Sequence, residues 1–238
     1  MKHLSRLEPG LPSKAGRRET IALAGLALVP DLTGALYAPD YRTLMVADLH
    51  FEKGSSRAGR GVHLPPYDTR STLGALAGAV ARYRPERLVS LGDSFHDGKG
   101  VDRLDAEDRA AIARLAGETQ IVWLAGNHDP DLPGDLPGII AAEVALGPVT
   151  LRHLPGGGAA EIAGHLHPVA AVVKRGRRLC RKCFVTDGER LVMPAFGAYT
   201  GGLNVLEAAF RPLLREAFTA WLIGRTAIHA FPARALRG

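Results

Sequence analysis

The stretch TLMVADLH (43–50) ends a run of apolar residues with an aspartate and a histidine two positions apart. Three later stretches have the same form: RLVSLGD (87–93), QIVWLAGNHD (120–129) and EIAGHLH (161–167). Each pattern predicts a buried strand that ends in Asp, Asn or His. In α/β folds, such strand ends lie at the carboxyl edge of a sheet, where functional sites are built. The four stretches therefore predict a dinuclear metal centre where four strands converge.

Outward from these stretches, the chain divides into two halves with different patterns. In the first half, apolar runs alternate with segments of helical periodicity, which predicts a βαβαβ unit and a mostly parallel sheet. The strands expected here are 43–47, 87–91 and 120–125, and the helices expected between them are 67–82 and 104–116. Asp68 or Thr69 is expected to cap the first of these helices.

The second half contains short apolar runs between Gly, Pro or charged turns, a pattern typical of strands in a more antiparallel sheet. These runs lie at 149–153, 161–163, 169–174, 179–185, 190–194 and 203–206. Two sheets packed face to face, with helices outside each sheet, would accommodate both halves. We therefore expect an α/β fold with two sheets.

Composition limits the class of protein. The 238 residues suit one domain, and the apolar fraction of 46% is ordinary for a globular protein. The two cysteines give no sign of an oxidising compartment. No apolar run approaches the roughly 18 residues of a membrane span. We expect a single domain over 19–238 after a flexible basic N-terminus over 1–18.

The apolar stretch IALAGLALVP (21–30) allows two interpretations. It follows Arg17 and Arg18, as in an export signal. However, Glu19 separates these arginines from the stretch, which is short and also fits a first strand or a hairpin. We favour the second interpretation and expect a cytoplasmic protein without a membrane partner.

Basic residues dominate the charge. The 30 Lys and Arg against 24 Asp and Glu give a net charge of +6, which favours polyanionic partners such as nucleic acid. The segment KRGRRLCRK (174–182) contains six basic residues. It is interpreted either as a hairpin that contacts DNA phosphates through Arg177, Arg178 and Arg181, or as a solvated hairpin without a function.

The residues at the strand ends suit a divalent metal. Asp48 and His50 are two positions apart, so their side chains would face the same way in extended backbone, and His165 and His167 share this spacing. Carboxylate and imidazole groups are good ligands for borderline divalent metals. Asp93 follows a glycine, and its two oxygens are free to bridge two ions. Each motif alone is weak evidence, since an isolated His is more often structural than a ligand. Together the motifs favour a metal-binding site.

The motifs DLH, GDxxH, GNHD and GHLH, in this order, resemble those of the calcineurin-like metallophosphoesterases. The resemblance spans about residues 43–168 and implies a four-layer α/β/β/α sandwich of two mixed sheets flanked by helices. By position, it assigns one metal ion to Asp48, His50, Asp93 and His167, and a second ion to Asp93, Asn127, His153 and His165. It also implies that His128 contacts the scissile phosphate, that Asp129 orients the His128 ring, and that a metal-activated hydroxide attacks the phosphorus.

A finer resemblance concerns the residues around these motifs. DLHFEKGSS (48–56), LPPYDTR (64–70), LGDSFHD (91–97) and PAFGAYTGGLNV (194–205) are similar to stretches of the bacterial ligase-associated metallophosphoesterases. That family comprises DNA endonucleases that work with an ATP-dependent DNA ligase and a helicase in DNA repair. The resemblance implies a phosphodiesterase that cuts DNA, preferably single-stranded. For its two divalent ions we favour manganese, with iron or zinc as alternatives. The extended basic N-terminus departs from the family.

Other residues leave alternatives open. His96 extends the GD motif and would contact substrate or support a ligand, and Arg57 follows the first motif and would flank the substrate. Cys180 and Cys183 form a lone CxxC pair, which is not expected to bind metal because the thiols would face opposite sides of a strand. Two other hypotheses compete with a nuclease. One is a small-molecule phosphodiesterase or phosphatase of the same superfamily, and the other is a scaffold without enzymatic activity.

Overall fold

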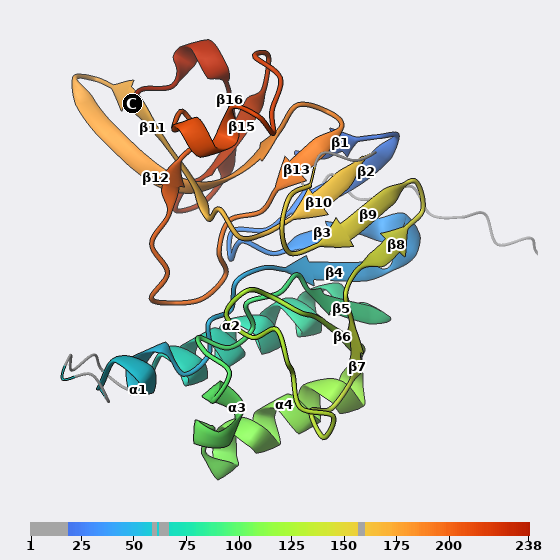
Figure 1. Ribbon diagram of the computed structural model, residues 1–238. Coiled ribbons are helices and arrows are strands. Elements are labelled where there is room, and N and C mark those ends of the chain that lie inside the picture. Colours follow the sequence, from blue (N-terminus) through green and yellow to red (C-terminus); the bar gives the residue numbers. More distant parts are fainter. Residues whose placement is uncertain (1–18, 59–60, 62–66, 157–159) are drawn as a thin grey trace, which may run out of the picture.

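The structure of the protein is a computed structural model that describes residues 19–58, 61, 67–156 and 160–238. The flexible N-terminus expected over 1–18 lies outside the described residues. Figure 1 shows two sheets packed against each other, with helices below the first sheet. The first sheet has the strand order β1-β2-β3-β4-β5-β6-β7. Its strands are β1 (Ile21–Leu23), β2 (Leu26–Pro30), β3 (Leu36–Ala38), β4 (Thr43–Val46), β5 (Arg87–Ser90), β6 (Gln120–Leu124) and β7 (Ile139–Ala141).

The first sheet is antiparallel from β1 to β4 and parallel from β4 to β7. Strand β4 is buried along its whole length, as expected for a parallel strand with both faces covered. The β1–β2 hairpin turns through Ala24 and Gly25, both with positive φ, which is typical of a tight two-residue turn. The stretch 21–30 is therefore a hairpin of this sheet, as the favoured interpretation expects.

The second sheet has the order β14-β11-β12-β13-β10-β9-β8, and β15 and β16 continue it beside β12. It is mixed, because β10 runs parallel to its neighbours β9 and β13 whereas β12 runs antiparallel to β11, β13 and β15. Its strands are β8 (Val144–Leu146), β9 (Val149–Arg152), β10 (Glu161–Ala163), β11 (Pro168–Lys174), β12 (Arg177–Thr186), β13 (Arg190–Val192), β14 (Leu203–Asn204), β15 (Thr219–Ile223) and β16 (Ile228–Pro232).

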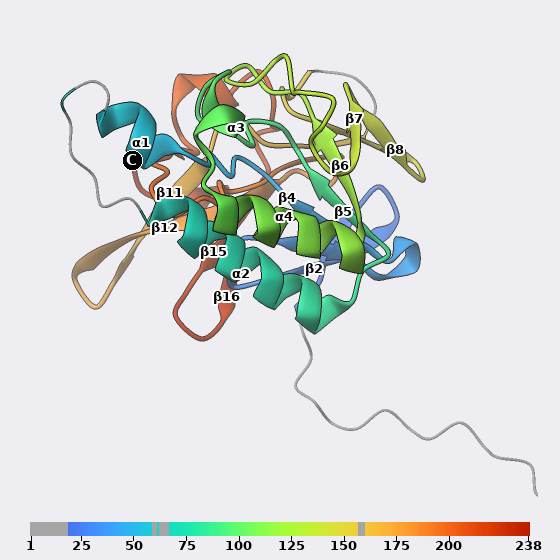
Figure 2. The same ribbon diagram turned by 90° about the horizontal axis from the view of Figure 1, so that it is seen from below.

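Apolar side chains hold the layers together. Met45 and Val89 from the first sheet pack against Ile162 and Leu191 from the second sheet, so the two sheets share one core. The other face of the first sheet is covered by α2 (Asp68–Tyr83) and α4 (Ala106–Glu118), which lie side by side in Figures 1 and 2. Two shorter helices, α1 (Lys53–Ala58) and α3 (Gly100–Arg103), follow the first and second motifs.

The expected α/β class with two mixed sheets is confirmed. The outer face of the second sheet, however, is covered by the 3-10 turns η2 (Ala208–Phe210) and η3 (Ala233–Ala235) and by the segments around them. Within the described part of the chain, every α-helix lies between residues 53 and 118. None of these helices is long and apolar enough to cross a membrane.

The start of α2 differs from the expectation that Asp68 or Thr69 caps this helix. The N-cap residue is Tyr67, and no side chain makes a capping hydrogen bond. The Asp68 carboxylate instead accepts a hydrogen bond from the Gly54 backbone N–H at 2.9 Å, and the Thr69 hydroxyl oxygen accepts one from the Glu52 backbone N–H at 2.8 Å. Both side chains are used to hold the segment that follows the first motif.

Candidate metal centre

The four motifs meet at one edge of the molecule. Asp48 and His50 follow β4, Asp93 follows β5, Asn127 follows β6, His153 follows β9, and His165 and His167 lie between β10 and β11. Backbone hydrogen bonds join the loops: the Asp48 N–H donates to the Gly92 carbonyl at 3.2 Å, and the His50 N–H donates to the Asp93 carbonyl at 2.9 Å. The adjacent parallel strands thus continue their pairing into the site.

The backbone of the site is strained. Five of the expected ligands have left-handed backbone, with φ between 47° and 71°: Asp48, His50, Asp93, His165 and His167. A non-glycine residue there costs about 1–3 kcal/mol and is held only where the surroundings require it. The extended backbone expected for the two Asp-x-His and His-x-His pairs is therefore wrong. Left-handed residues that alternate with Leu49 and Leu166, rather than a regular extended strand, place the two side chains of each pair.

The first cluster consists of Asp48, His50 and His167, whose ligand atoms all lie within 4.8 Å of one another. Asp48 is fully buried, and its carboxylate accepts a hydrogen bond from the His165 backbone N–H at 3.0 Å. The His167 Nε2 lies 3.2 Å from Asp48 Oδ1 and 3.4 Å from His50 Nε2. His50 Nδ1 is buried without a hydrogen-bond partner.

The second cluster consists of Asp93, His153 and His165, again within 4.8 Å of one another. The His153 Nδ1–H donates to the Leu91 carbonyl at 2.9 Å, which directs Nε2 into the site. This Nε2 lies 2.9 Å from Asn127 Oδ1 and 3.3 Å from Asp93 Oδ1. With the proton on Nδ1, His153 Nε2 presents a lone pair to both of these oxygens. Either a proton on Nε2 or a bound divalent cation would place a positive charge among the three atoms. A divalent cation fits this donor set.

The pKa values reflect burial and the close charges. Burial opposes the ionised form of Asp93, but the hydrogen bond and charge of His153 outweigh it and hold the Asp93 pKa at about 2. Burial, assisted by His167 and Lys53, lowers the pKa of His50 to about 3 against the opposing charge of Asp93. His50 is thus neutral at pH 7, which is the form of imidazole that binds a metal.

His128 is placed differently from the ligands. Its side chain is 42% exposed, its Nδ1–H donates to the His96 carbonyl at 2.9 Å, and its Nε2 lies 4.0 Å from Asp93 Oδ2. The His96 ring stacks on it at a centroid distance of 5.4 Å. The His96 carbonyl orients the His128 ring and leaves Nε2 facing the site.

The expectation that Asp129 orients the His128 ring is wrong. The Asp129 carboxylate accepts hydrogen bonds from the backbone N–H groups of Phe95 at 2.9 Å and Gly126 at 3.0 Å. Burial is the largest influence on this group and raises its pKa to about 6 despite these bonds. Asp129 thus fixes the two loops that carry Asp93 and Asn127 relative to each other.

A lysine that the motifs do not include supports the first loop. The Lys182 Nζ donates to the carbonyls of Ala195 and Gly197, at 2.8 and 3.2 Å, and to the Thr200 hydroxyl at 3.0 Å. The Gly197 N–H in turn donates to the Asp48 carbonyl at 3.2 Å. Burial lowers the pKa of Lys182 to about 8. Lys182 lies in the basic segment noted in the sequence, but no sequence pattern predicts this supporting contact.

The other residues expected to bind substrate lie at three places in the structure. His96 lies beside the clusters, and its pKa falls to about 4, first through burial and then through the charge of Lys53. Arg57 is exposed in the last turn of α1. Arg177, Arg178 and Arg181 belong to neither cluster. They are exposed on β12, which runs back toward the site antiparallel to β11.

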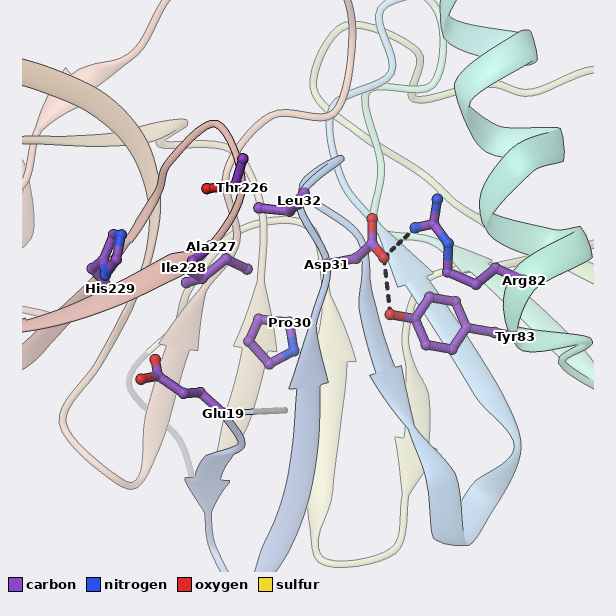
Figure 3. Close-up of a pocket in the computed structure, with 10 residues that line it drawn as sticks. All are labelled: Glu19, Pro30, Asp31, Leu32, Arg82, Tyr83, Thr226, Ala227, Ile228 and His229. Atoms are coloured by element: carbon purple, nitrogen blue, oxygen red, sulfur yellow. Dashed lines mark hydrogen bonds and ion pairs between the residues drawn. The ribbon is translucent and has the colours of Figure 1, made fainter. Parts of the chain in front are cut away.

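A cavity of about 540 Å³ lies elsewhere, between the edge of the first sheet and the β15–β16 turn (Figure 3). It contains none of the expected ligands. Its buried carboxylate, Asp31, already binds the Arg82 guanidinium and the Tyr83 hydroxyl, as the dashed lines in Figure 3 show. These contacts fasten the end of α2 to the loop after β2, so the cavity is part of the scaffold and not of the metal centre.

The fold and the donor set together define a metal-dependent α/β enzyme, and the comparisons with known proteins identify its family. Neither a protein-family model nor a curated protein matches the chain. Among solved structures, the crystal structure of nuclease MPE from Pseudomonas putida has 31% sequence identity and a TM-score of 0.71, with 90% of this chain and 98% of that chain covered. The phosphoesterase YfcE from E. coli has 16% identity and a TM-score of 0.41, covering 82% of this chain and 99% of that one.

The chain belongs to the metallophosphoesterase superfamily. It is therefore a phosphoesterase that depends on divalent metal.

Proposed function

We propose that the centre binds two divalent ions, with Asp93 between them. The first ion would be held by Asp48, His50, Asp93 and His167, and the second by Asp93, Asn127, His153 and His165. The support is that Asp48, His50 and His167 converge, that Asp93, His153 and His165 converge, and that Asn127 Oδ1 lies 2.9 Å from His153 Nε2. Because the donors are oxygen and nitrogen without a thiolate, we favour manganese, with iron or zinc as alternatives.

The metal ions and the side chains around them would have different roles in phosphodiester cleavage. When bound, the metal ions would act as Lewis acids on the phosphate and on the attacking water. His128 directs Nε2 toward the substrate side, where it would stabilise or protonate the leaving oxygen, a role worth about 10²–10⁴-fold. His96 stacks against His128, and Arg57 would bind a phosphate at the entrance.

We propose DNA, preferably single-stranded, as the substrate and endonucleolytic cleavage as the reaction. The observation that carries this is the likeness to nuclease MPE over nearly the whole chain, supported by the net charge of +6. The His128 side chain is 42% exposed, so a large substrate can reach it. Work in DNA repair in the cytoplasm, with an ATP-dependent DNA ligase and a helicase, is part of the proposal through the motif resemblance.

The proposal is tested with purified protein, four metals and four substrates. Mn, Zn, Fe and Mg are each combined with linear and circular single-stranded DNA, duplex DNA and a chromogenic phosphodiester. We expect fastest cutting of single-stranded DNA with Mn, and cutting of the circle would establish endonucleolytic action. Rapid hydrolysis of the chromogenic diester without cutting of any DNA would instead support a small-molecule phosphodiesterase.

A further inference from the structure

The hairpin formed by β11 and β12 projects beyond the second sheet. β11 begins directly after His167, and six residue pairs join it to β12, from Val169↔Lys182 to Lys174↔Arg177. β12 pairs with β15 only from Cys183 onward, and β11 pairs with β14 only at Pro168 and Val169. Ala171 of β11 also forms a bridge with Arg237. Beyond Ala171 the hairpin is a two-stranded ribbon, which Figures 1 and 2 show extending away from the body of the protein.

The ribbon carries positive charge that no Asp or Glu side chain of the described residues neutralises. Five of its exposed residues are basic: Lys174, Arg175, Arg177, Arg178 and Arg181. None of them forms an ion pair with an Asp or Glu side chain of the described residues. Arg178 donates to a backbone oxygen of the terminal residue Gly238 at 3.2 Å, and Arg181 donates to the Cys180 carbonyl. Elsewhere, exposed arginines such as Arg42 and Arg70 bind carboxylates. The charges of Lys174, Arg175, Arg177 and Arg181 are therefore free to meet an external anion.

Two of these basic residues also weaken the ribbon locally. Lys174 and Arg177 lie directly opposite each other across the strands, and like charges in that position repel. Arg175 has φ 52° and begins a two-residue turn whose left-handed positions favour Asn or Gly. An isolated two-stranded ribbon is already marginally stable. Both features lower the stability of the ribbon when nothing is bound to it. An anion bound at its tip would relieve the repulsion between the like charges.

We propose that the β11–β12 ribbon is a binding arm for the phosphate backbone of single-stranded DNA that leaves the metal centre. This deepens the proposed function and rests on it. β11 spans about 23 Å at ~3.3 Å per residue, so the ribbon runs beside several nucleotides. Residues 174–182 include no aromatic side chain, so the arm contributes charge and not base stacking. Its binding is therefore independent of the base sequence.

The test compares two triple variants that each remove three positive charges. The arm variant carries Lys174→Gln, Arg175→Asn and Arg177→Gln, in which Asn suits the left-handed turn position. The control variant carries Arg84→Asn, Arg114→Gln and Arg225→Gln. These exposed residues lie at the C-cap of α2, on α4 and in the β15–β16 turn. Both are measured with a single-stranded oligonucleotide, a duplex and a chromogenic phosphodiester, at several salt concentrations.

We expect the arm variant to raise the KM for single-stranded DNA about 10–100-fold near 0.15 M salt. The slope of log KM against log salt should fall by about 2, because each of the three lost phosphate contacts contributes roughly 0.7 to the slope. Its selectivity for DNA over the chromogenic diester should fall by the same factor, whereas the control variant should keep it. Fluorescence anisotropy in EDTA should show the same loss of binding without turnover.

Three results would overturn the inference while the proposed function stands: equal losses in both variants, an unchanged salt slope in the arm variant, or a loss confined to duplex DNA. If wild-type protein cuts no DNA but hydrolyses the small diester, the proposed function itself fails, and the arm fails with it.

Discussion

Gly126 is the position where one added methyl group would most directly disturb the metal centre. A Cβ there would lie 2.2 Å from both the backbone N and Oδ1 of Asp93, and 2.7 Å from Asp129 Oδ1. Ordinary contact begins at 3.4 Å, so Gly126→Ala requires Asp93 or its neighbours to move by about 1 Å. A displacement of that size lowers kcat by ~10²-fold. Overpacking costs a further ~1–3 kcal/mol of stability.

The measurements are kcat on a phosphodiester at saturating metal and the thermal unfolding midpoint. The matched control is Gly117→Ala in α4, where a Cβ meets nothing within 4 Å and the helix should gain up to ~1 kcal/mol. We expect Gly126→Ala to remain folded, with Tm lowered by ~2–12 °C, and to lose most of its activity. A Gly126→Ala protein with kcat within twofold of wild type would refute the close packing of these two loops.

Three other perturbations test separate parts of the structure. Lys182→Met leaves the Ala195 and Gly197 carbonyls without their donor, so urea denaturation should show a loss of ~1–3 kcal/mol together with a lower kcat; unchanged stability would contradict the supporting role. Burial raises the pKa of Asp31, but the bonds from Thr33, Arg82 and Tyr83 outweigh it and leave the pKa below its usual value. Its stabilisation is therefore fully present above pH ~4 and is lost as the pH falls through the lowered pKa. In urea denaturation, the free energy of unfolding of wild type should exceed that of Asp31→Asn by more at pH 6 than at pH 3. An equal difference at both pH values would contradict this. Removing metal with EDTA should lower Tm, and restoring metal at ~1,000 times Kd should recover ~4 kcal/mol. Asp93→Asn should be inactive and show a much smaller metal-dependent shift, and a full shift in that variant would argue against Asp93 as a ligand.

The sequence predicted the elements that carry strong local patterns. Helix α2 was expected over 67–82 and spans Asp68–Tyr83, because buried residues recur along one face. The strands that precede the motifs were placed within about two residues for the same reason. β7, β8, β15 and β16 were not predicted. In β16, for instance, the sequence IHAFP has no buried residue, so its pairing with β15 leaves no apolar alternation to detect.

The site was predictable in its residue types but not in its supporting contacts. Metal-ligand side chains are visible in a sequence because their chemistry is specific to residue type. The partner that orients His128 is the carbonyl of His96, which every residue possesses, so no motif can reveal it. The contacts of Asp129 and Lys182 likewise depend on loops that come together only in the folded chain.

The left-handed backbone at the expected ligands has a consequence for how this protein could change. Glycine would adopt those five conformations without strain, so replacing a ligand by glycine removes a local energetic penalty together with the function. If only the stability of the fold were selected, substitutions to glycine at these positions would therefore be favoured and the metal centre would be lost. Side chains that occupy strained positions are expected where the side chain itself is needed, and this chain has Asp48, His50, Asp93, His165 and His167 there.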